Sequence, residues 1–131
     1  MDDRVWKEMM TYYDERAEEY DEIYRGLFRR KRHGTIDPSV YQKDVTRASE
    51  MASGFGKGHL VDIACGPGFW LRYYGRNCSR ITLLDQSEKM LKECAKRVEK
   101  LGLGDLVSLN QGDFFEVKLE TSAFDSALTG F

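Results

Sequence analysis

The sequence has few cysteines, few histidines and no long apolar run, and each shortage excludes a class of protein. Its three cysteines, Cys65, Cys78 and Cys94, are odd in number and lack the close pairs of a zinc site, so we expect reduced, mostly buried thiols and no metal. The two histidines, His33 and His59, are isolated, and we assign neither to chemistry. No run of about 18 apolar residues is present, so no membrane span is expected.

The chain also lacks an excess of either charge. With 20 basic and 22 acidic residues its net charge is -2, which gives no general attraction to nucleic acid or to acidic membranes. The N-terminal stretch MDDRVWKEMM is too acidic and too amphipathic for a secretory signal, so a cytoplasmic protein is expected. A length of 131 residues allows one hydrophobic core and is too short for two.

Residues 1–33 have a helical pattern of apolar side chains. Spacings of three and four residues predict one long helix or two short ones. The residues on this face are Trp6, Met9, Met10, Tyr13, Ala17, Tyr20, Tyr24 and Leu27. Acidic residues precede basic ones, the order that suits a helix dipole, and the basic cluster at 25–32 is interpreted as a solvated helix end rather than a nucleic-acid patch.

A second helix is predicted from Asp37, a favourable N-cap, and from Pro38 at the first helical position. Its apolar face comprises Tyr41, Val45, Ala48 and Met51. The helix is expected to end near residues 53–54, where serine and glycine follow each other.

From Gly58 onward strands alternate with helices, which predicts an α/β sheet with crossover helices. Strands are expected over residues 59–64, 80–85, 106–113 and 124–131, and a short helix over 69–74. A longer helix should begin after Ser87 as N-cap and close at Gly102. Its apolar stripe comprises Met90, Leu91, Cys94, Ala95, Val98 and Leu101.

The turn after the first strand contains Gly66, Pro67 and Gly68 but lacks the features of a phosphate-binding loop. Leu71 stands where a dinucleotide-binding fingerprint has its third glycine, and no lysine follows as in a P-loop. Gly66 and Gly68 still allow the backbone to pass close to a ligand. The turn is therefore unsuited to a pyrophosphate.

Three acids accompany the predicted strand ends, which is where open α/β sheets bind their ligands. Asp62 indicates a ligand with positive charge nearby. Asp85 is placed to accept both hydroxyls of a ribose, and Asp113 to accept from an exocyclic amine such as that of adenine. Together the acids favour a nucleoside without phosphates.

Four segments resemble, in their order and spacing, the motifs of the class I S-adenosylmethionine-dependent methyltransferases: VDIACGPG, LLDQSEKML, NQGDFF and FDSALTGF. The upstream YYDERAEEYDEIY is similar to the helical lead-in of the small-molecule branch of that superfamily. The resemblance implies a Rossmann-like fold, with a helical lead-in or lid over residues 1–57 and the cofactor-binding half over 58–131. One departure is Ala64, where the family usually has glycine, and the small alanine is expected to preserve the turn.

The resemblance implies S-adenosylmethionine as cofactor, with the glycine turn near its methionine part. The residues implied in cofactor binding are Asp62, Ala64, Gly66, Gly68, Asp85, Gln86, Met90, Asp113, Phe114, Thr129, Gly130, Tyr13 and Tyr20. Asp62 would accept from the ammonium, directly or through water, Asp85 would hold the ribose diol, and Met90 would lie against the adenine. Asp113 would accept from the adenine amine. The backbone amide of Phe114 would reach a ring nitrogen, and its side chain would help to enclose the base.

The remaining roles are weaker. Thr129 and Gly130 would line the floor near the sulfonium. Tyr13 and Tyr20 are candidates to close over the methionine end, although their helical spacing favours core packing. Asp85 taken alone is as much a candidate helix cap, and its cofactor role depends on the ordered set of motifs.

The implied chemistry is an in-line displacement at the methyl carbon of an activated sulfonium. Positioning and desolvation supply much of the catalysis, and a general base is needed only where the nucleophile holds a proton. We identify no catalytic residue. The segment ALTG differs from the Asn-Pro-Pro-Tyr type of pattern of nucleobase amino-methyltransferases, so a small-molecule acceptor is expected, with lipid, quinone or tRNA acceptors left open.

The family's sheet continues beyond the position of Phe131, so the chain is expected to be a fragment or to be completed by a partner. A fourth strand with Phe124, Ala127, Leu128 and Phe131 would form an exposed apolar edge that favours self-association or a second chain. The alternatives to a methyltransferase are a non-catalytic cofactor-binding or interaction module and, less favoured, an NAD-binding Rossmann domain.

Overall fold

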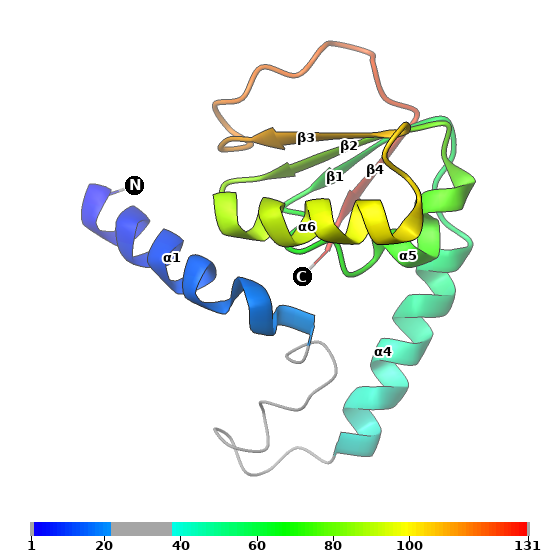
Figure 1. Cartoon of the computed structure of the whole chain (residues 1–131), viewed down its shortest axis with the longest axis horizontal. Helices are drawn as coiled ribbons and strands as arrows, with labels where there is room; N and C mark the ends of the chain where they lie inside the picture. Colours follow the sequence, from blue (N-terminus) through cyan, green and yellow to red (C-terminus); the bar gives the residue numbers. More distant parts are fainter. Residues whose placement is uncertain (1, 22–37, 131) are drawn as a thin grey trace.

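The sheet is parallel and has the strand order β3-β2-β1-β4 in the computed structural model, which describes residues 2–21 and 38–130 (Figure 1). Its strands are β1 (His59–Ile63), β2 (Arg80–Asp85), β3 (Val107–Gln111) and β4 (Ser126–Thr129). β1 pairs with both β2 and β4, so the strand order reverses beside β1. Such a reversal leaves a crevice at the carboxyl ends of the strands. The predicted α/β fold with four parallel strands is confirmed.

The helix α6 (Glu88–Leu101) connects β2 to β3 and begins and ends as predicted. The Ser87 side chain accepts from the backbone N–H of Met90 at 3.1 Å, which satisfies one of the free N–H groups at the helix start. Gly102 closes the helix with a φ of 69°, a left-handed conformation that glycine adopts without strain. Ala95 is exposed, so the apolar stripe is narrower than expected. Its buried members are Met90, Leu91, Cys94 and Val98.

The helix α4 (Pro38–Ser53) has the predicted bounds, but its buried face differs from the predicted one. Val45 and Ala52 are buried, whereas Met51 is 70% exposed, so placing Met51 on the inner face was wrong. Ala52 continues the spacing of Val45 and Ala48, while Met51 lies about 100° away around the helix. The predicted N-cap Asp37 lies outside the described residues.

The N-terminal lead-in consists of α1 (Asp3–Arg16) followed by the 3₁₀ helix η1 (Ala17–Glu19). Asp2 caps α1 by accepting from the Arg4 N–H at 2.8 Å. No residue of α1 is buried, and Ala17 is the one buried residue among residues 2–21. The rest of the predicted helical pattern, including Tyr24 and Leu27, falls outside the described residues, as do the basic cluster at 25–32 and His33.

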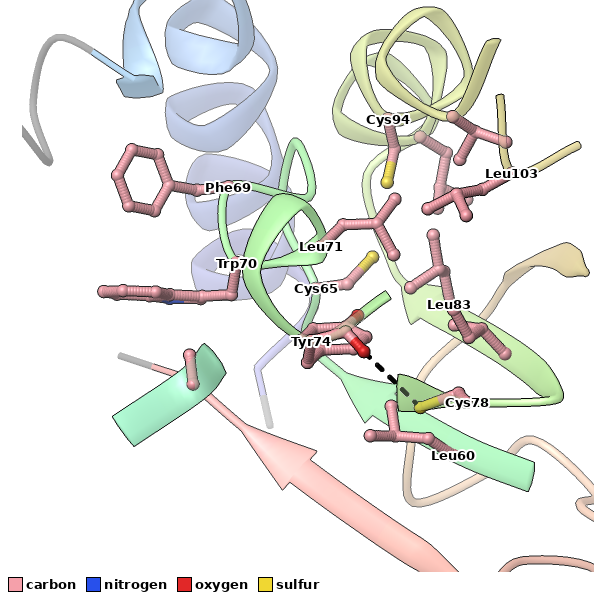
Figure 2. Close-up of a cluster of buried hydrophobic side chains, with 14 of the residues drawn as sticks. Leu60, Cys65, Phe69, Trp70, Leu71, Tyr74, Cys78, Leu83, Cys94 and Leu103 are labelled. Atoms are coloured by element: carbon pink, nitrogen blue, oxygen red, sulfur yellow. Dashed lines mark hydrogen bonds between the residues drawn. The ribbon is translucent and has the colours of Figure 1, made fainter. Parts of the chain in front are cut away.

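The core lies where α6, α4 and the short helix α5 (Leu71–Tyr74) pack on the sheet, and α5 continues into the 3₁₀ helix η2 (Gly75–Asn77) (Figure 2). Leu60, Leu71, Tyr74, Ile81 and Leu83 are fully buried there. The three cysteines are buried and unpaired, as predicted. The first two strands, α4, α5 and α6 therefore share one hydrophobic core.

Cys65, in the glycine turn, contacts the α6 residue Cys94. A hydrogen bond with Cys94 and burial raise the pKa of the Cys65 thiol, which keeps it protonated and unsuited to nucleophilic chemistry.

His59 has a structural position at the amino end of β1. One ring nitrogen lies 2.9 Å from the carbonyl oxygen of Ala123, and the other lies 2.8 Å from the hydroxyl of Thr82. The ring of Phe124 packs on it, with ring centroids 4.5 Å apart. The histidine thus ties β1 to β2 and to the segment before β4, and it lies at the sheet end away from the crevice.

Replacing Gly68 by alanine is expected to destabilise the fold more than replacing Gly66. Both glycines have a positive φ, 75° and 56°, so each alanine carries a backbone cost of about 1–2 kcal/mol. A Cβ on Gly68 would lie 2.7 Å from the Cys94 Sγ, whereas a Cβ on Gly66 would meet no atom within 4 Å. Overpacking should add about 1–3 kcal/mol at Gly68. Urea denaturation of both variants measures the difference.

The matched control removes the sulfur atom. In a Cys94→Ala background the cost of Gly68→Ala should fall toward that of Gly66→Ala, because the overlapping atom is gone. Equal costs for the two alanines in the parent chain would contradict this account of the turn.

Candidate functional site

A cavity of about 310 Å³ lies at the carboxyl ends of β1 and β2. The sheet, the glycine turn, the start of α6 and the segment after β3 form one side of it, and the lead-in forms the other. The predicted site residues that line it are Tyr13, Tyr20, Ala64, Gly66, Asp85, Gln86, Met90, Phe114 and Gly130. The structure therefore gathers at one place nine residues that span most of the described chain.

The glycine turn is held in a left-handed conformation by bonds to β2. Ala64, Gly66 and Gly68 have φ angles of 55°, 56° and 75°. The Cys65 N–H donates to the carbonyl of Leu84 at 3.0 Å, and the Gly66 N–H donates to the Asp85 Oδ2 at 2.8 Å. Left-handed alanine is strained, so these bonds compensate a local cost at Ala64. The space beside Gly66 is open.

Asp85 is the last residue of β2 and the central acid of the site. Its Oδ2 accepts from the Gly66 N–H at 2.8 Å, and its Oδ1 accepts from the Ser87 N–H at 2.9 Å. The N-cap of α6 is Ser87, so the helix-cap alternative for Asp85 is wrong. Burial raises the pKa of Asp85, and the backbone bonds from Ser87 and Gly66 oppose that shift. Each carboxylate oxygen retains lone-pair capacity for one further donor.

Asp62 lies in β1 behind the glycine turn and does not line the cavity. It is 2% exposed, and its Oδ2 accepts from the hydroxyl of Tyr74 at 2.6 Å. Burial raises the pKa of Asp62 to about 7, the bond from Tyr74 lowers it, and the charge of Asp85 raises it. The Tyr74 bond was not foreseen, because nothing in the spacing of residues 62 and 74 brings them together before the turn is formed. The predicted contact of Asp62 with an ammonium stays a prediction.

Three other predicted residues also lie outside the cavity lining: Gly68, Asp113 and Thr129. Asp113 lies two residues beyond the end of β3, and its Oδ1 accepts from the Phe115 N–H at 2.9 Å, which forms a local turn. Gly68 packs toward Cys94.

Thr129 is exposed at the end of β4, and the neighbouring Gly130 lines the cavity in its place.

The lead-in contributes more of the site than expected. Tyr13 and Tyr20 line the cavity instead of joining the core cluster, with their ring centroids 6.4 Å apart. Met9 and Met10 line it as well and were not predicted, although their helical spacing with Tyr13 was the available signal. Burial raises the pKa of Tyr20. One wall of the cavity is therefore formed by lead-in residues that are not part of the hydrophobic core.

The lining also includes residues of the sheet and its connections that were not predicted: Ile63, Leu84 and Gly112. Among the described residues, none that lines the cavity is basic. Gln86 lines the cavity, and its buried Oε1 has no hydrogen-bond partner in the described part of the chain. The charge and hydrogen-bonding character of the site suits a ligand rich in hydroxyl and amino groups and poor in negative charge.

Two further properties concern the described residues alone. Their His, Cys, Asp and Glu side chains form no group of three that could hold a metal ion. None of their helices combines the length and the apolar character that crossing a membrane requires.

Residues 60–131 match the family model described as a methyltransferase domain, which covers more than half of the chain. The DhpI–SAM–HEP complex matches with a TM-score of 0.69 and 24% identity, over 98% of this chain and 52% of that chain. The DhpI–SAH complex matches with a TM-score of 0.60 and 26% identity, over 85% of this chain and 46% of that chain.

A third solved structure shows the same fold at lower identity. Geranyl diphosphate C-methyltransferase from Streptomyces coelicolor A3(2), solved with Mg²⁺, geranyl diphosphate and S-adenosyl-L-homocysteine, matches with a TM-score of 0.58 and 18% identity, over 68% of this chain and 35% of that chain. The chain thus spans about half the length of the two DhpI structures, 52% and 46%. A comparison with curated proteins gave no match.

Asp62→Asn is expected to gain stability relative to the parent as the pH rises from about 4 to 7. The Asp62 pKa is about 7 in the folded chain and about 3.9 in an unfolded one, so the folded state retains a proton that the unfolded state releases. The resulting stabilisation is complete below about pH 4 and is lost as the pH rises through 7. Asparagine has no proton to lose, so the gain should reach about 2–4 kcal/mol.

Urea denaturation at a series of pH values measures this gain. Asp105→Asn is the control, because it removes an exposed carboxylate from the same domain and should show no comparable gain. A pH-independent difference between Asp62→Asn and the parent would contradict the buried-acid assignment.

Proposed function

The chain belongs to the methyltransferase-domain family, and we propose that it binds S-adenosylmethionine in the cavity at the carboxyl ends of β1 and β2, as the cofactor site of a methyltransferase that acts on a small molecule. The observation that carries the proposal is Asp85, a buried acid with both oxygens anchored by backbone N–H groups and with capacity left for a ribose diol. The family match removes the NAD-binding alternative.

The residues present fit this cofactor. A cavity of about 310 Å³ is at the lower end of the range for small-molecule sites, about 300–1,000 Å³. Asp85 would bind the ribose hydroxyls, and Met90 and Phe114 would enclose the adenine. The unpartnered Gln86 Oε1 is an acceptor for an amine or hydroxyl of the nucleoside. Asp113 is also proposed to accept a hydrogen bond from the adenine amine, because its Oδ2 is not used in the local turn.

The methionine end would lie along the glycine turn. The open space beside Gly66 admits a ligand close to the backbone, and Gly130 offers a second approach without a side chain. Asp62 would act on the ammonium through water, since its own carboxylate is 2% exposed. Gly68 would support this end by keeping the turn packed on α6, and Thr129 by fixing the end of β4.

The bound cofactor would supply an activated methyl group on a sulfonium. The part that this chain plays is to orient that group and to exclude water. The exclusion of water would fall to the lead-in residues that cover the cavity: Met9, Met10, Tyr13 and Tyr20. We assign no general base. We also propose the division into a lead-in or lid at 1–57 and a cofactor-binding part at 58–131, with the covering role assigned to the residues of segment 2–21.

The acceptor is proposed to be a small molecule. One support is the similar geranyl diphosphate C-methyltransferase, whose structure is a complex with geranyl diphosphate. Another is that no basic residue lines the cavity in the described part of the chain. The chain spans 52% and 46% of the two DhpI structures, so methyl transfer is proposed for the whole protein, and cofactor binding is the property to test in this chain.

Asp85→Ala is expected to weaken binding of S-adenosylhomocysteine by roughly ten- to a hundredfold or more. Each charge-assisted hydrogen bond to a ribose hydroxyl contributes about 1.5–3 kcal/mol. Asp85→Asn should recover part of the loss, because the amide keeps one acceptor. Isothermal titration of the parent and both variants measures the effect.

NAD serves as the comparison ligand in the same titrations, and thermal unfolding shows whether each variant is folded. Tighter binding of NAD than of S-adenosylhomocysteine by the parent would reject the proposed cofactor. Unchanged binding by a folded Asp85→Ala variant would show that the ribose lies elsewhere.

The chain is expected to self-associate through β4, which is an edge of the sheet. Leu128 packs against the core, whereas Ala127 is exposed on the same strand. Ala127→Lys should therefore reduce association without disturbing the core. Lys118→Ala, at an exposed site outside the strands, is the control. Light scattering over a concentration series measures the mass. A constant monomer mass in the parent would contradict the expectation.

A further inference from the structure

The lead-in over residues 2–21 lies outside the hydrophobic core cluster. No α1 residue is buried, and Ala17 alone is buried among residues 2–21. Yet this segment supplies four of the cavity-lining residues, Met9, Met10, Tyr13 and Tyr20. These four side chains are partly buried, so apolar contacts contribute to the attachment, and polar contacts add defined attachment points.

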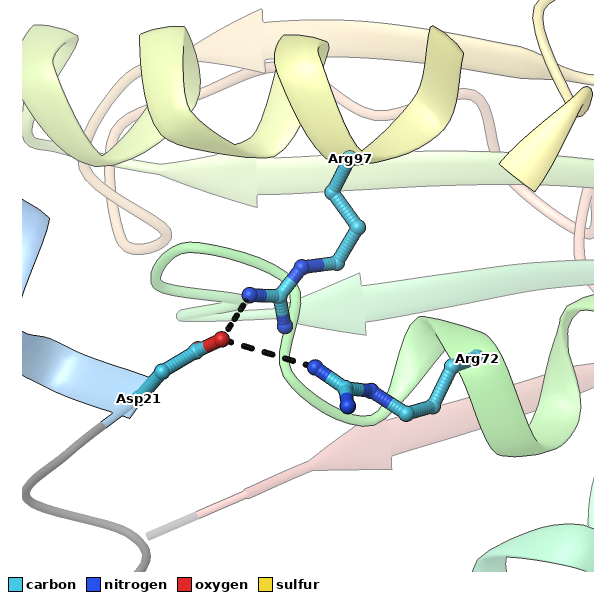
Figure 3. A network of polar contacts seen from close by, with 3 residues as sticks. All are labelled: Asp21, Arg72 and Arg97. Carbon is cyan, nitrogen blue, oxygen red and sulfur yellow. Dashed lines mark hydrogen bonds and ion pairs between the residues drawn. The ribbon is translucent and has the colours of Figure 1, made fainter. Parts of the chain in front are cut away.

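Side-chain hydrogen bonds connect the lead-in to the sheet domain near both of its ends. The Ser87 hydroxyl donates to the Asp14 Oδ1, which joins α1 to the N-cap of α6. At the other end of the lead-in, the Asp21 Oδ2 accepts from both Arg97 Nη2 and Arg72 Nη2, the latter at 3.4 Å (Figure 3). Arg97 belongs to α6, and Arg72 belongs to α5, which directly follows the glycine turn.

The arginine cluster is partly shielded from solvent, most of all at Arg97. The side chains of Arg97, Asp21 and Arg72 are 16%, 27% and 32% exposed. Ion pairs at this depth are screened less by salt and water than fully exposed pairs. The Arg97 Cδ also lies 3.9 Å from the position of a Cβ on Gly68, so the cluster rests against the glycine turn.

Only part of the hydrogen-bonding capacity of the cluster is used. Both arginines share one oxygen of Asp21, while the Asp21 Oδ1 and the Arg97 Nη1 are buried without a hydrogen-bond partner in the described part of the chain. A carboxylate and a guanidinium can pair through two parallel bonds, and that arrangement is the stronger one. A rotation of the Asp21 carboxylate relative to the Arg97 guanidinium would satisfy both orphan atoms at once.

We propose that Asp21, Arg97 and Arg72 form a latch that positions the lead-in over the cofactor, and that the latch tightens to a two-bond Asp21–Arg97 pair when the cavity is filled. Tyr20 precedes Asp21 in the chain and lines the cavity, so the latch sets the position of that ring. The three latch residues are positioning residues, because none of them lines the cavity. The proposal rests on the proposed function, since it concerns the affinity for that cofactor.

Asp21→Asn in the full chain is the test, with Glu19→Gln as the matched control that removes the same charge from an exposed position of the lead-in. The Asp21 variant should bind S-adenosylhomocysteine about three- to tenfold more weakly, mainly through faster dissociation, as expected for loss of a partly buried ion pair. Its affinity should also depend less on salt than that of the parent. Hydrogen exchange of the amides in residues 3–21 should slow on cofactor binding in the parent and much less in the variant.

A second variant separates the latch from a general charge effect. Arg97→Gln should weaken binding by a similar or smaller factor, because the Arg72–Asp21 contact remains. The double variant Asp21→Asn/Arg97→Gln should be no weaker than Asp21→Asn alone, because Asp21→Asn already removes the contact to Arg97. Thermal unfolding identifies any variant that is not folded.

The outcomes distinguish the latch from the proposed function. Failure of the parent to bind S-adenosylhomocysteine would overturn the proposed function. Binding by the parent with unchanged affinity and exchange in Asp21→Asn would overturn the latch alone. Equal weakening by Glu19→Gln and Asp21→Asn would also overturn it, since the effect would then be one of net charge.

Discussion

The two hydrogen bonds that the Asp85 carboxylate accepts are the constraint on which the rest of the site depends. One comes from Gly66 in the turn after β1, and the other comes from Ser87 at the start of α6. A single side chain thereby ties together the turn that approaches the ligand and the helix that carries Met90 into the cavity. The bond from Gly66 reinforces the backbone bond from Cys65 to Leu84, which also connects the left-handed turn to the carboxyl end of β2.

The same region concentrates the unfavourable features of the fold. Burial raises the pKa of both Asp62 and Asp85, and Ala64 is held at a φ of 55°. Each feature costs folding free energy, and the fully buried core of Leu60, Leu83 and their neighbours offsets that cost. A concentration of unfavourable features is typical of binding sites, where polar groups are positioned to bind a ligand instead of one another.

The sequence predicted the features that local rules determine and missed those that depend on tertiary contact. Ser87 and Gly102 predicted the two ends of α6, and the apolar runs predicted β1 and β2, because capping and burial act over a few residues. The resemblance to the methyltransferase family predicted that Asp85 is a residue of the site, and Asp85 lines the cavity. Met51 was misplaced because the next residue, Ala52, fits the same helical spacing. The Asp62–Tyr74 hydrogen bond could not be predicted from the spacing of the two residues along the sequence.

The cavity thus has two walls of different physical origin. The wall formed by the sheet, the glycine turn and α6 is backed by the core, so its geometry is fixed before any ligand arrives. The wall formed by the lead-in has no buried residue in α1 and is attached through side-chain contacts of Asp14 and Asp21. Ordering that second wall costs conformational entropy, which a ligand touching both walls must offset. Affinity at this site is therefore set as much by how the lead-in is held as by the residues that contact the nucleoside.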